Sequence, residues 1–125
     1  MRRLDPHEAD EKFRKGLDQF NHRHFFEAHE TWEEIWLPAP EPGKTFLQGI
    51  IQVAAAFHHY TRRNRAGTRS LLQAGLKKLE RFPKTHRGLQ LEELRAAVRR
   101  WIAALEAGED PGPEELPRIE HVRGR

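Results

Sequence analysis

The sequence contains no cysteine, and this absence removes several classes of site at once. Without thiols the chain forms no disulfide framework, iron–sulfur centre or zinc ribbon, and it has no cysteine nucleophile. The absence also fits a reducing compartment. The chain instead carries eight histidines, and their positions decide which metal or acid–base sites it can form.

Long apolar runs are missing as well. The longest, residues 53–57, is far shorter than the roughly 20 residues that a helix needs to cross a bilayer, and the charged residues 1–11 lack the apolar stretch of a signal peptide. We therefore expect a soluble cytoplasmic protein without a membrane partner. A chain of 125 residues has room for one hydrophobic core, so we expect a single helical-bundle domain over residues 1–108 and a proline-rich, charged C-terminal tail over residues 109–125.

No stretch of the sequence shows the alternation that is typical of strands. Apolar residues instead recur every three or four positions, and Asp5, Pro6 and Glu8 have the spacing of a helix start with a capping box. The pattern predicts an all-α protein, a compact antiparallel bundle of about five helices. The predicted helices cover approximately residues 6–21, 24–36, 45–63, 67–82 and 90–107. The tail is expected to be extended and to pack loosely through Leu116 and Ile119.

Two polar seams interrupt the apolar faces of the predicted second and third helices. At about 100° per residue, His29 and Glu33 lie together at the edge of the apolar stripe of the second helix. Gln48, Gln52 and His59 form a narrow polar line on the third helix, which is otherwise apolar nearly all round. Consecutive helices joined by a short loop usually pack antiparallel, so the two seams are expected to face each other. Each buried polar group costs roughly 1–3 kcal/mol when unpaired, so the seams need partners.

Three interpretations of this cluster stay open. The first is a hydrogen-bonded structural network that fixes the register of two helices. The second is a divalent metal site with His29, Glu33 and His59 as ligands, although Glu33 stands where a zincin helix has its second histidine. The third is a small-molecule site in which His29 or Glu33 acts as acid or base and glutamine amides hold the ligand. The sequence shows no nucleophile or phosphate loop, and it leaves enzymatic activity undecided.

Charge is polarised along the chain. Residues 1–60 hold seven basic and ten acidic side chains, whereas residues 61–87 hold nine basic side chains against Glu80 alone. This basic segment is either a solvated face that pairs with the acidic half, within the chain or across a homo-oligomer, or a surface that docks an acidic protein or nucleic acid. Single-strand binding usually adds exposed aromatic residues, and the segment offers only Phe82, so the pattern favours the solvated face.

Several spaced motifs are typical of one family. They are Phe20-Asn21, the run from Phe25 to Glu30, Trp32-Glu33, Trp36, the run from Gln48 to Ala54, His59, and the run from Asn64 to Gly67. In this order, between about residues 13 and 105, they resemble the small helical proteins catalogued as domain of unknown function 309. The resemblance implies an all-helical, soluble fold with no established activity. Its signature positions fall on Asn21, His29, Glu30, Glu33, Trp36, Gln48, Gly49, Gln52, His59 and Asn64. Arg63 departs from the pattern, in which we expect glycine.

The seams and the resemblance together predict a polar cluster between the second and third helices that binds a small polar ligand or a divalent metal. The predicted ligand-binding residues are His29, Glu30, Glu33, Gln48, Gln52, His59 and Asn64. The predicted metal ligands are His29, Glu33 and His59. The alternative function is an interaction module that docks an acidic partner or nucleic acid through residues 61–87, with a purely structural polar cluster.

Overall fold

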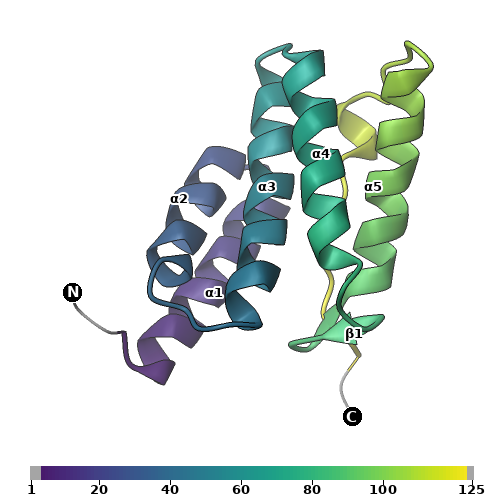
Figure 1. Cartoon of the computed structure of the whole chain (residues 1–125). Helices are drawn as coiled ribbons and strands as arrows, with labels where there is room; N and C mark the ends of the chain where they lie inside the picture. Colours follow the sequence, from purple (N-terminus) through teal and green to yellow (C-terminus); the bar gives the residue numbers. More distant parts are fainter. Residues whose placement is uncertain (1–3, 124–125) are drawn as a thin grey trace.

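The computed structural model describes residues 4–123, which form a bundle of five α-helices (Figure 1). The helices are α1 (Pro6–Asn21), α2 (Phe25–Trp36), α3 (Gly43–Thr61), α4 (Arg65–Leu79) and α5 (Leu91–Glu106). Each helix packs against the next one along the chain, so the predicted all-α antiparallel bundle is confirmed. Within the described range, no helix is long and apolar enough to span a bilayer.

Local capping explains where the helices begin. At α1 the backbone N–H of Glu8 donates to Asp5 Oδ1 at 2.9 Å, and the Asp5 N–H donates back to Glu8 Oε1, which completes the predicted capping box. Asn64 caps α4 by accepting from the Gly67 N–H at 3.0 Å. This helix therefore begins at Arg65, two residues before its predicted start. The bounds of α3 are likewise about two residues earlier than predicted.

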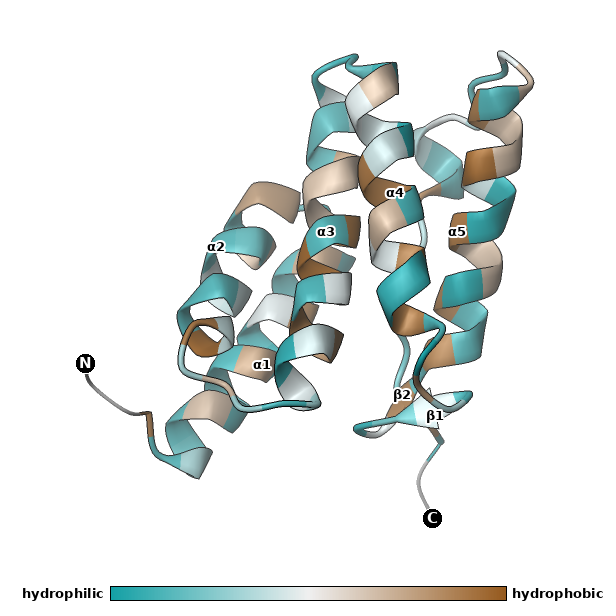
Figure 2. Ribbon diagram, in the orientation of Figure 1, coloured by the Kyte–Doolittle hydropathy of each residue, from teal (hydrophilic) through white to brown (hydrophobic). Residues whose placement is uncertain are grey.

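The core of the bundle is built around α3. Phe57 is fully buried, and its ring lies 6.3 Å from Phe20 of α1, 5.6 Å from Phe25 of α2 and 5.1 Å from Trp101 of α5, measured between centroids. One side chain of the central helix thus contacts three other helices. In Figure 2 the helices carry both hydrophobic and hydrophilic bands along their length, as expected of helices with one buried and one exposed face.

A small antiparallel hairpin lies between α4 and α5. Its strands are β1 (Thr85–His86) and β2 (Leu89–Gln90), which the sequence pattern did not indicate and which leave the fold predominantly helical. Arg87 (φ 50°) and Gly88 (φ 76°) both take positive φ at the turn, the geometry that a two-residue hairpin connection requires. Strands of two residues are too short to produce a recognisable alternation in the sequence.

The segment after α5 crosses the bundle and is held by it. It contains one 3-10 turn (Pro113–Glu115), and both Leu116 and Ile119 are buried, the latter with 1% of its surface exposed. The Asn21 side chain accepts from the Ile119 N–H at 2.8 Å and donates to the Ile119 carbonyl at 3.0 Å. A backbone hydrogen bond of 2.8 Å joins the segment to β2. The packing is therefore tighter than the loose contact that the sequence suggests.

Candidate functional site

A cavity of about 210 Å³ lies between α2 and α3 and reaches α4; we refer to it as the α2–α3 cavity. Four of the seven predicted ligand-binding residues line it: His29 and Glu33 from α2, and Gln48 and Gln52 from α3. The full lining is His29, Glu33, Trp36, Gln48, Ile51, Gln52, Ala55 and Leu71. The structure thus brings four of the predicted polar residues, two from each helix, to one cavity.

His29 and Glu33 meet because they lie one turn apart on α2. His29 Nε2 is 3.4 Å from Glu33 Oε2, and the two side chains are 25% and 51% exposed. An ionised carboxylate at this position favours the imidazole tautomer with its proton on Nε2, and Nδ1 is then a hydrogen-bond acceptor. In that tautomer the acceptor of His29 is Nδ1, on the opposite side of the ring from Glu33.

Two buried polar atoms at this cavity have no hydrogen-bond partner among residues 4–123. They are His29 Nδ1 and Trp36 Nε1. A buried polar group left unpaired costs about 1–3 kcal/mol, which is why such groups are rare in folded proteins. A network of fully paired side chains would leave neither atom without a partner, so these two atoms favour the interpretation of the cluster as a binding site.

The third wall of the cavity comes from α4, which approaches α3 at a pair of glycines. A Cβ atom on Gly75 would lie 2.9 Å from the carbonyl oxygen of Gly49, so the two backbones touch. Near this contact Gln52 Oε1 accepts from Lys78 Nζ at 3.0 Å. The side-chain amide of Gln48 makes no hydrogen bond within the described part of the chain. One amide of the seam is thus tied to α4, and the other faces the cavity without a partner.

Three of the predicted ligand-binding residues lie away from the cavity. Glu30 is exposed and is absent from the lining of the cavity. His59 Nδ1 is 3.0 Å from Asn64 Nδ2, so the last turn of α3 meets the residue that caps α4, at the end of α3 away from the cavity. His59 follows Gln52 by two turns of α3, about 10 Å along the helix axis. The angular positions of Gln52 and His59 around the helix axis are similar, and they contain no information on this distance along the axis.

The predicted metal ligands are not brought together. His29 and Glu33 form a pair, but His59 lies with Asn64 instead. No group of three or more histidine or carboxylate side chains in the described range is placed to hold a metal ion. The structure therefore does not assemble the predicted three-residue site, because the distance along α3 separates its third member from the other two.

The predicted set omits two residues that the structure places at or near the site, Trp36 and His58. The His58 ring lies 5.1 Å from the ring of Phe26, which stacks on His29 at 6.0 Å. Burial lowers the pKa of His58 below its usual value. The sequence contains a signal for His58. At about 100° per residue it lies within about 20° of Ile51, which lines the cavity, so the two residues share one face of α3.

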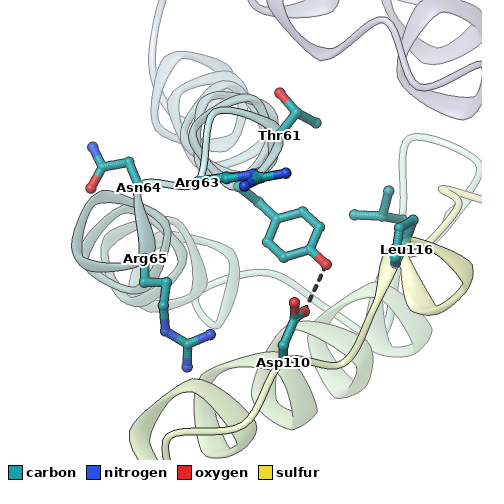
Figure 3. Close-up of a pocket in the computed structure, with 8 residues that line it drawn as sticks. Thr61, Arg63, Asn64, Arg65, Asp110 and Leu116 are labelled. Atoms are coloured by element: carbon teal, nitrogen blue, oxygen red, sulfur yellow. Dashed lines mark hydrogen bonds between the residues drawn. The ribbon is translucent and has the colours of Figure 1, made fainter.

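A second cavity, of about 650 Å³, lies at the turn between α3 and α4; we call it the turn cavity (Figure 3). Its lining consists of Tyr60, Thr61, Arg63, Asn64, Arg65, Asp110, Pro113 and Leu116. The Tyr60 hydroxyl donates to Asp110 Oδ1 at 2.7 Å. Burial and this hydrogen bond raise the pKa of Tyr60 to about 12, and the same bond lowers the pKa of Asp110. None of its described lining residues has a buried unpaired polar atom, so the smaller α2–α3 cavity is the better candidate site.

Comparison with known proteins gives a family match in the part of the chain that forms this cavity. Residues 13–71 match the model of the family described as Domain of unknown function (DUF309), which confirms the resemblance. The chain is similar to an uncharacterized protein of Aquifex aeolicus (strain VF5), 31% identical over 88 residues that cover 70% of this chain and 26% of the relative. It is also similar to the uncharacterized protein YpuF of Bacillus subtilis (strain 168), 37% identical over 59 residues that cover 46% of this chain and 34% of the relative.

The chain thus spans about a quarter to a third of the length of these curated relatives. All the residues that line the α2–α3 cavity fall within the matched range, whereas the turn cavity draws part of its lining from residues 110–116, outside it.

Proposed function

We propose that this protein binds a small polar molecule in the α2–α3 cavity, and that the ligand carries a carbonyl group beside an N–H group, as amides and ureas do. One observation carries the proposal: two buried polar atoms without partners in residues 4–123, His29 Nδ1 and Trp36 Nε1, belong to side chains that line the same cavity. A ligand that pairs with both atoms removes the free-energy cost of leaving them unpaired.

The two unpaired atoms have opposite hydrogen-bonding character. The indole N–H of Trp36 is only a donor, whereas Nδ1 of His29 is an acceptor when the Nε2 proton faces Glu33. A carbonyl oxygen of the ligand accepts from Trp36, and a neighbouring N–H of the ligand donates to His29. The side-chain amide of Gln48, which has no hydrogen bond within residues 4–123, supplies a further donor and acceptor.

The volume and walls of the cavity limit the size of the ligand. At about 210 Å³ the cavity is smaller than the roughly 300 Å³ at which pockets for drug-sized ligands begin. Ile51, Ala55 and Leu71 give it an apolar wall that suits a small ring or a short aliphatic chain. We therefore favour a compact metabolite as the ligand, and we propose a cytoplasmic location in line with the cysteine-free composition.

Isothermal titration calorimetry with nicotinamide, urea and free glutamine tests the proposal. Each probe carries the amide or urea group, and the three differ in size and apolar surface. We expect saturable binding of at least one probe, weakened by about tenfold or more in Trp36→Phe, which removes the N–H and keeps an aromatic ring. We expect a similar loss in His29→Gln, which removes the imidazole acceptor.

His24→Gln is the matched control, because His24 is an exposed histidine that precedes α2 and does not line the cavity. Its affinity for the probe should equal that of the parent protein. The proposal fails if none of the probes binds, or if Trp36→Phe and His24→Gln bind equally well. A rise in melting midpoint with zinc or manganese that His29→Gln abolishes would replace the organic ligand by a metal ion.

The basic residues 61–87 provide no comparable observation in favour of docking. Arg65, Lys78 and Arg87 each contact another residue of the chain, and Arg63 and Arg65 line the turn cavity. Binding of an acidic protein or of nucleic acid through this segment therefore stays a prediction from charge alone. Binding that weakens steeply with added salt would support it.

A further inference from the structure

Three arginines adopt a left-handed backbone conformation that L-residues rarely take. Their φ angles are 69° at Arg23, 61° at Arg63 and 50° at Arg87. Glycine takes this conformation at no steric cost, so an arginine there needs compensation from its contacts. Arg23 donates to two backbone carbonyls of the C-terminal segment at 3.0 and 3.2 Å, and Arg87 lies 4.2 Å over the ring of Phe13. In these two residues the contacts of the side chain compensate for the strain in the backbone.

Arg63 lacks such compensation. Its guanidinium makes no hydrogen bond or ion pair with the described residues, and its side chain lines the turn cavity. Figure 3 shows Arg63 projecting from the turn on the side of the cavity where Leu116 lies, whereas Asn64 points away. Glycine would occupy this turn position without strain, whereas the exposed side chain of Arg63 keeps its donors free, within residues 4–123, to bind a ligand.

The turn cavity has a positive balance of charge. Arg63 and Arg65 both line it, and Asp110, the one carboxylate among its described lining residues, already accepts hydrogen bonds from Tyr60 and from the Gly112 N–H. Arg65 gives one N–H to a backbone carbonyl and keeps its other donors. The first turn of α4 adds partial positive charge beside the two guanidinium groups. A volume of about 650 Å³ lies within the range of small-molecule sites, roughly 300–1,000 Å³.

We propose that the turn cavity is a second binding site, which takes the phosphate or carboxylate group of a small molecule with Arg63 as its main ligand. The planar guanidinium group matches both oxyanions because it donates two parallel N–H bonds to a pair of oxygens. The turn cavity shares no lining residue with the α2–α3 cavity. The two proposed sites are therefore independent, and each is tested by its own experiment.

Titration of the ¹⁵N-labelled protein with inorganic phosphate, and separately with acetate at the same ionic strength, tests this second site. We expect saturable chemical-shift changes confined to residues 60–65 and 110–116. Arg63→Gly should weaken binding by about tenfold or more and should fold at least as well as the parent, because glycine accepts the positive φ. Arg63→Lys should retain part of the affinity, since it keeps the charge but loses the planar fork.

Arg62→Gln is the control, because Arg62 is an exposed neighbour in sequence that does not line the cavity. We expect it to bind the anion about as tightly as the parent, and His29→Gln to do the same. Stronger binding of phosphate would assign a phosphate group to the ligand, and stronger binding of acetate a carboxylate. The proposal is overturned if neither anion gives a saturable shift, or if Arg62→Gln and Arg63→Gly weaken binding equally.

Discussion

The three tryptophans contrast two regions of the molecule. Trp32 Nε1 donates to the Phe13 carbonyl at 3.1 Å, and Trp101 Nε1 donates to the Glu115 carbonyl at 2.8 Å. The indole of Trp32 thus contacts α1, and that of Trp101 contacts the C-terminal segment. Trp36 Nε1, at the edge between α2 and α3, is also buried but finds no acceptor in residues 4–123. The first two indoles are paired within the fold, whereas the Trp36 N–H is the donor that we propose to pair with a ligand.

The left-handed arginines repeat this contrast. Arg23 and Arg63 occupy equivalent positions in two helix–helix turns, since each donates its N–H three residues back, to Phe20 and to Tyr60, at 3.0 Å. The Arg23 side chain holds the C-terminal segment, whereas that of Arg63 meets no partner in the described range. Two turns of one backbone geometry thus differ in what the arginine does. The contacts of Arg23 give it a structural role. The absence of such contacts at Arg63 within residues 4–123 supports the proposal that it binds a ligand.

The largest expected effect separates two of the tryptophans. Trp32→Phe should lower the free energy of unfolding by about 2–4 kcal/mol, because it leaves a cavity and removes a hydrogen bond in the core. Trp36→Phe should change it by less than about 1 kcal/mol, because the N–H that it removes is unpaired. Urea denaturation of both variants measures the difference. Equal losses would mean that Trp36 is a structural residue like Trp32.

The glycine contact beneath the α2–α3 cavity offers the next test. Gly75→Ala should cost about 1–3 kcal/mol and push α4 away from α3, because the new Cβ meets the carbonyl of Gly49. We expect weaker probe binding as well, since Leu71 moves with α4. Gly43→Ala is the control, because a Cβ there has no neighbour within 4 Å and should be tolerated. Thermal melting and calorimetry follow the two effects, and an undisturbed Gly75→Ala would show that α4 does not shape the cavity.

A matched pair of substitutions tests the two turns. Arg23→Gly and Arg63→Gly both relieve the same backbone strain. The contribution of this strain therefore cancels when the free energies of unfolding of the two variants are compared. Arg23→Gly also loses two hydrogen bonds to the C-terminal segment, and its free energy of unfolding should be lower by about 1–2 kcal/mol. Chemical denaturation provides the values. A result in which Arg63→Gly is the less stable variant would give Arg63 a structural role and weaken its assignment as a ligand.

The smallest effect is a pH dependence carried by two histidines. Burial lowers the pKa of His58 and of His86, whose ring centroid lies 4.7 Å from that of Phe46 and 4.8 Å from that of Phe82. The unfolded chain then binds protons more readily than the folded one, so stability holds above the ordinary histidine pKa of 6.5 and falls as pH drops below it. The double variant His58→Gln/His86→Gln should melt with a flatter profile between about pH 7 and 5. An unchanged slope would contradict these pKa shifts.

Much of the fold follows from local patterns in the sequence. The bounds of α1 match the prediction because its start depends on the local hydrogen bonds between Asp5 and Glu8. The course of the C-terminal segment was not predictable, because it depends on contacts such as Asn21 with Ile119, which lie 98 residues apart. Periodicity reports which face of a helix is buried, but it contains no information on pairs so distant.

The candidate site was predictable on α2 and α3 but not beyond them. Angular position on the two helices placed His29 and Glu33 opposite Gln48 and Gln52, and the structure has all four around one cavity. Leu71 was missed because its position depends on how closely α4 approaches α3, and that approach is a tertiary contact between glycine backbones. The turn cavity was missed for a related reason, since the C-terminal segment supplies one of its walls.

The indole N–H resonances test the central claim most directly, because one ¹H–¹⁵N spectrum compares all three tryptophans in the same sample. With nicotinamide, urea or glutamine added, the account predicts a saturable shift of the Trp36 resonance, while the Trp32 and Trp101 resonances stay in place because their acceptors lie within the fold. An unmoved Trp36 resonance with every probe, or equal shifts of all three resonances, would contradict the claim that the unpaired atoms of the α2–α3 cavity mark a binding site.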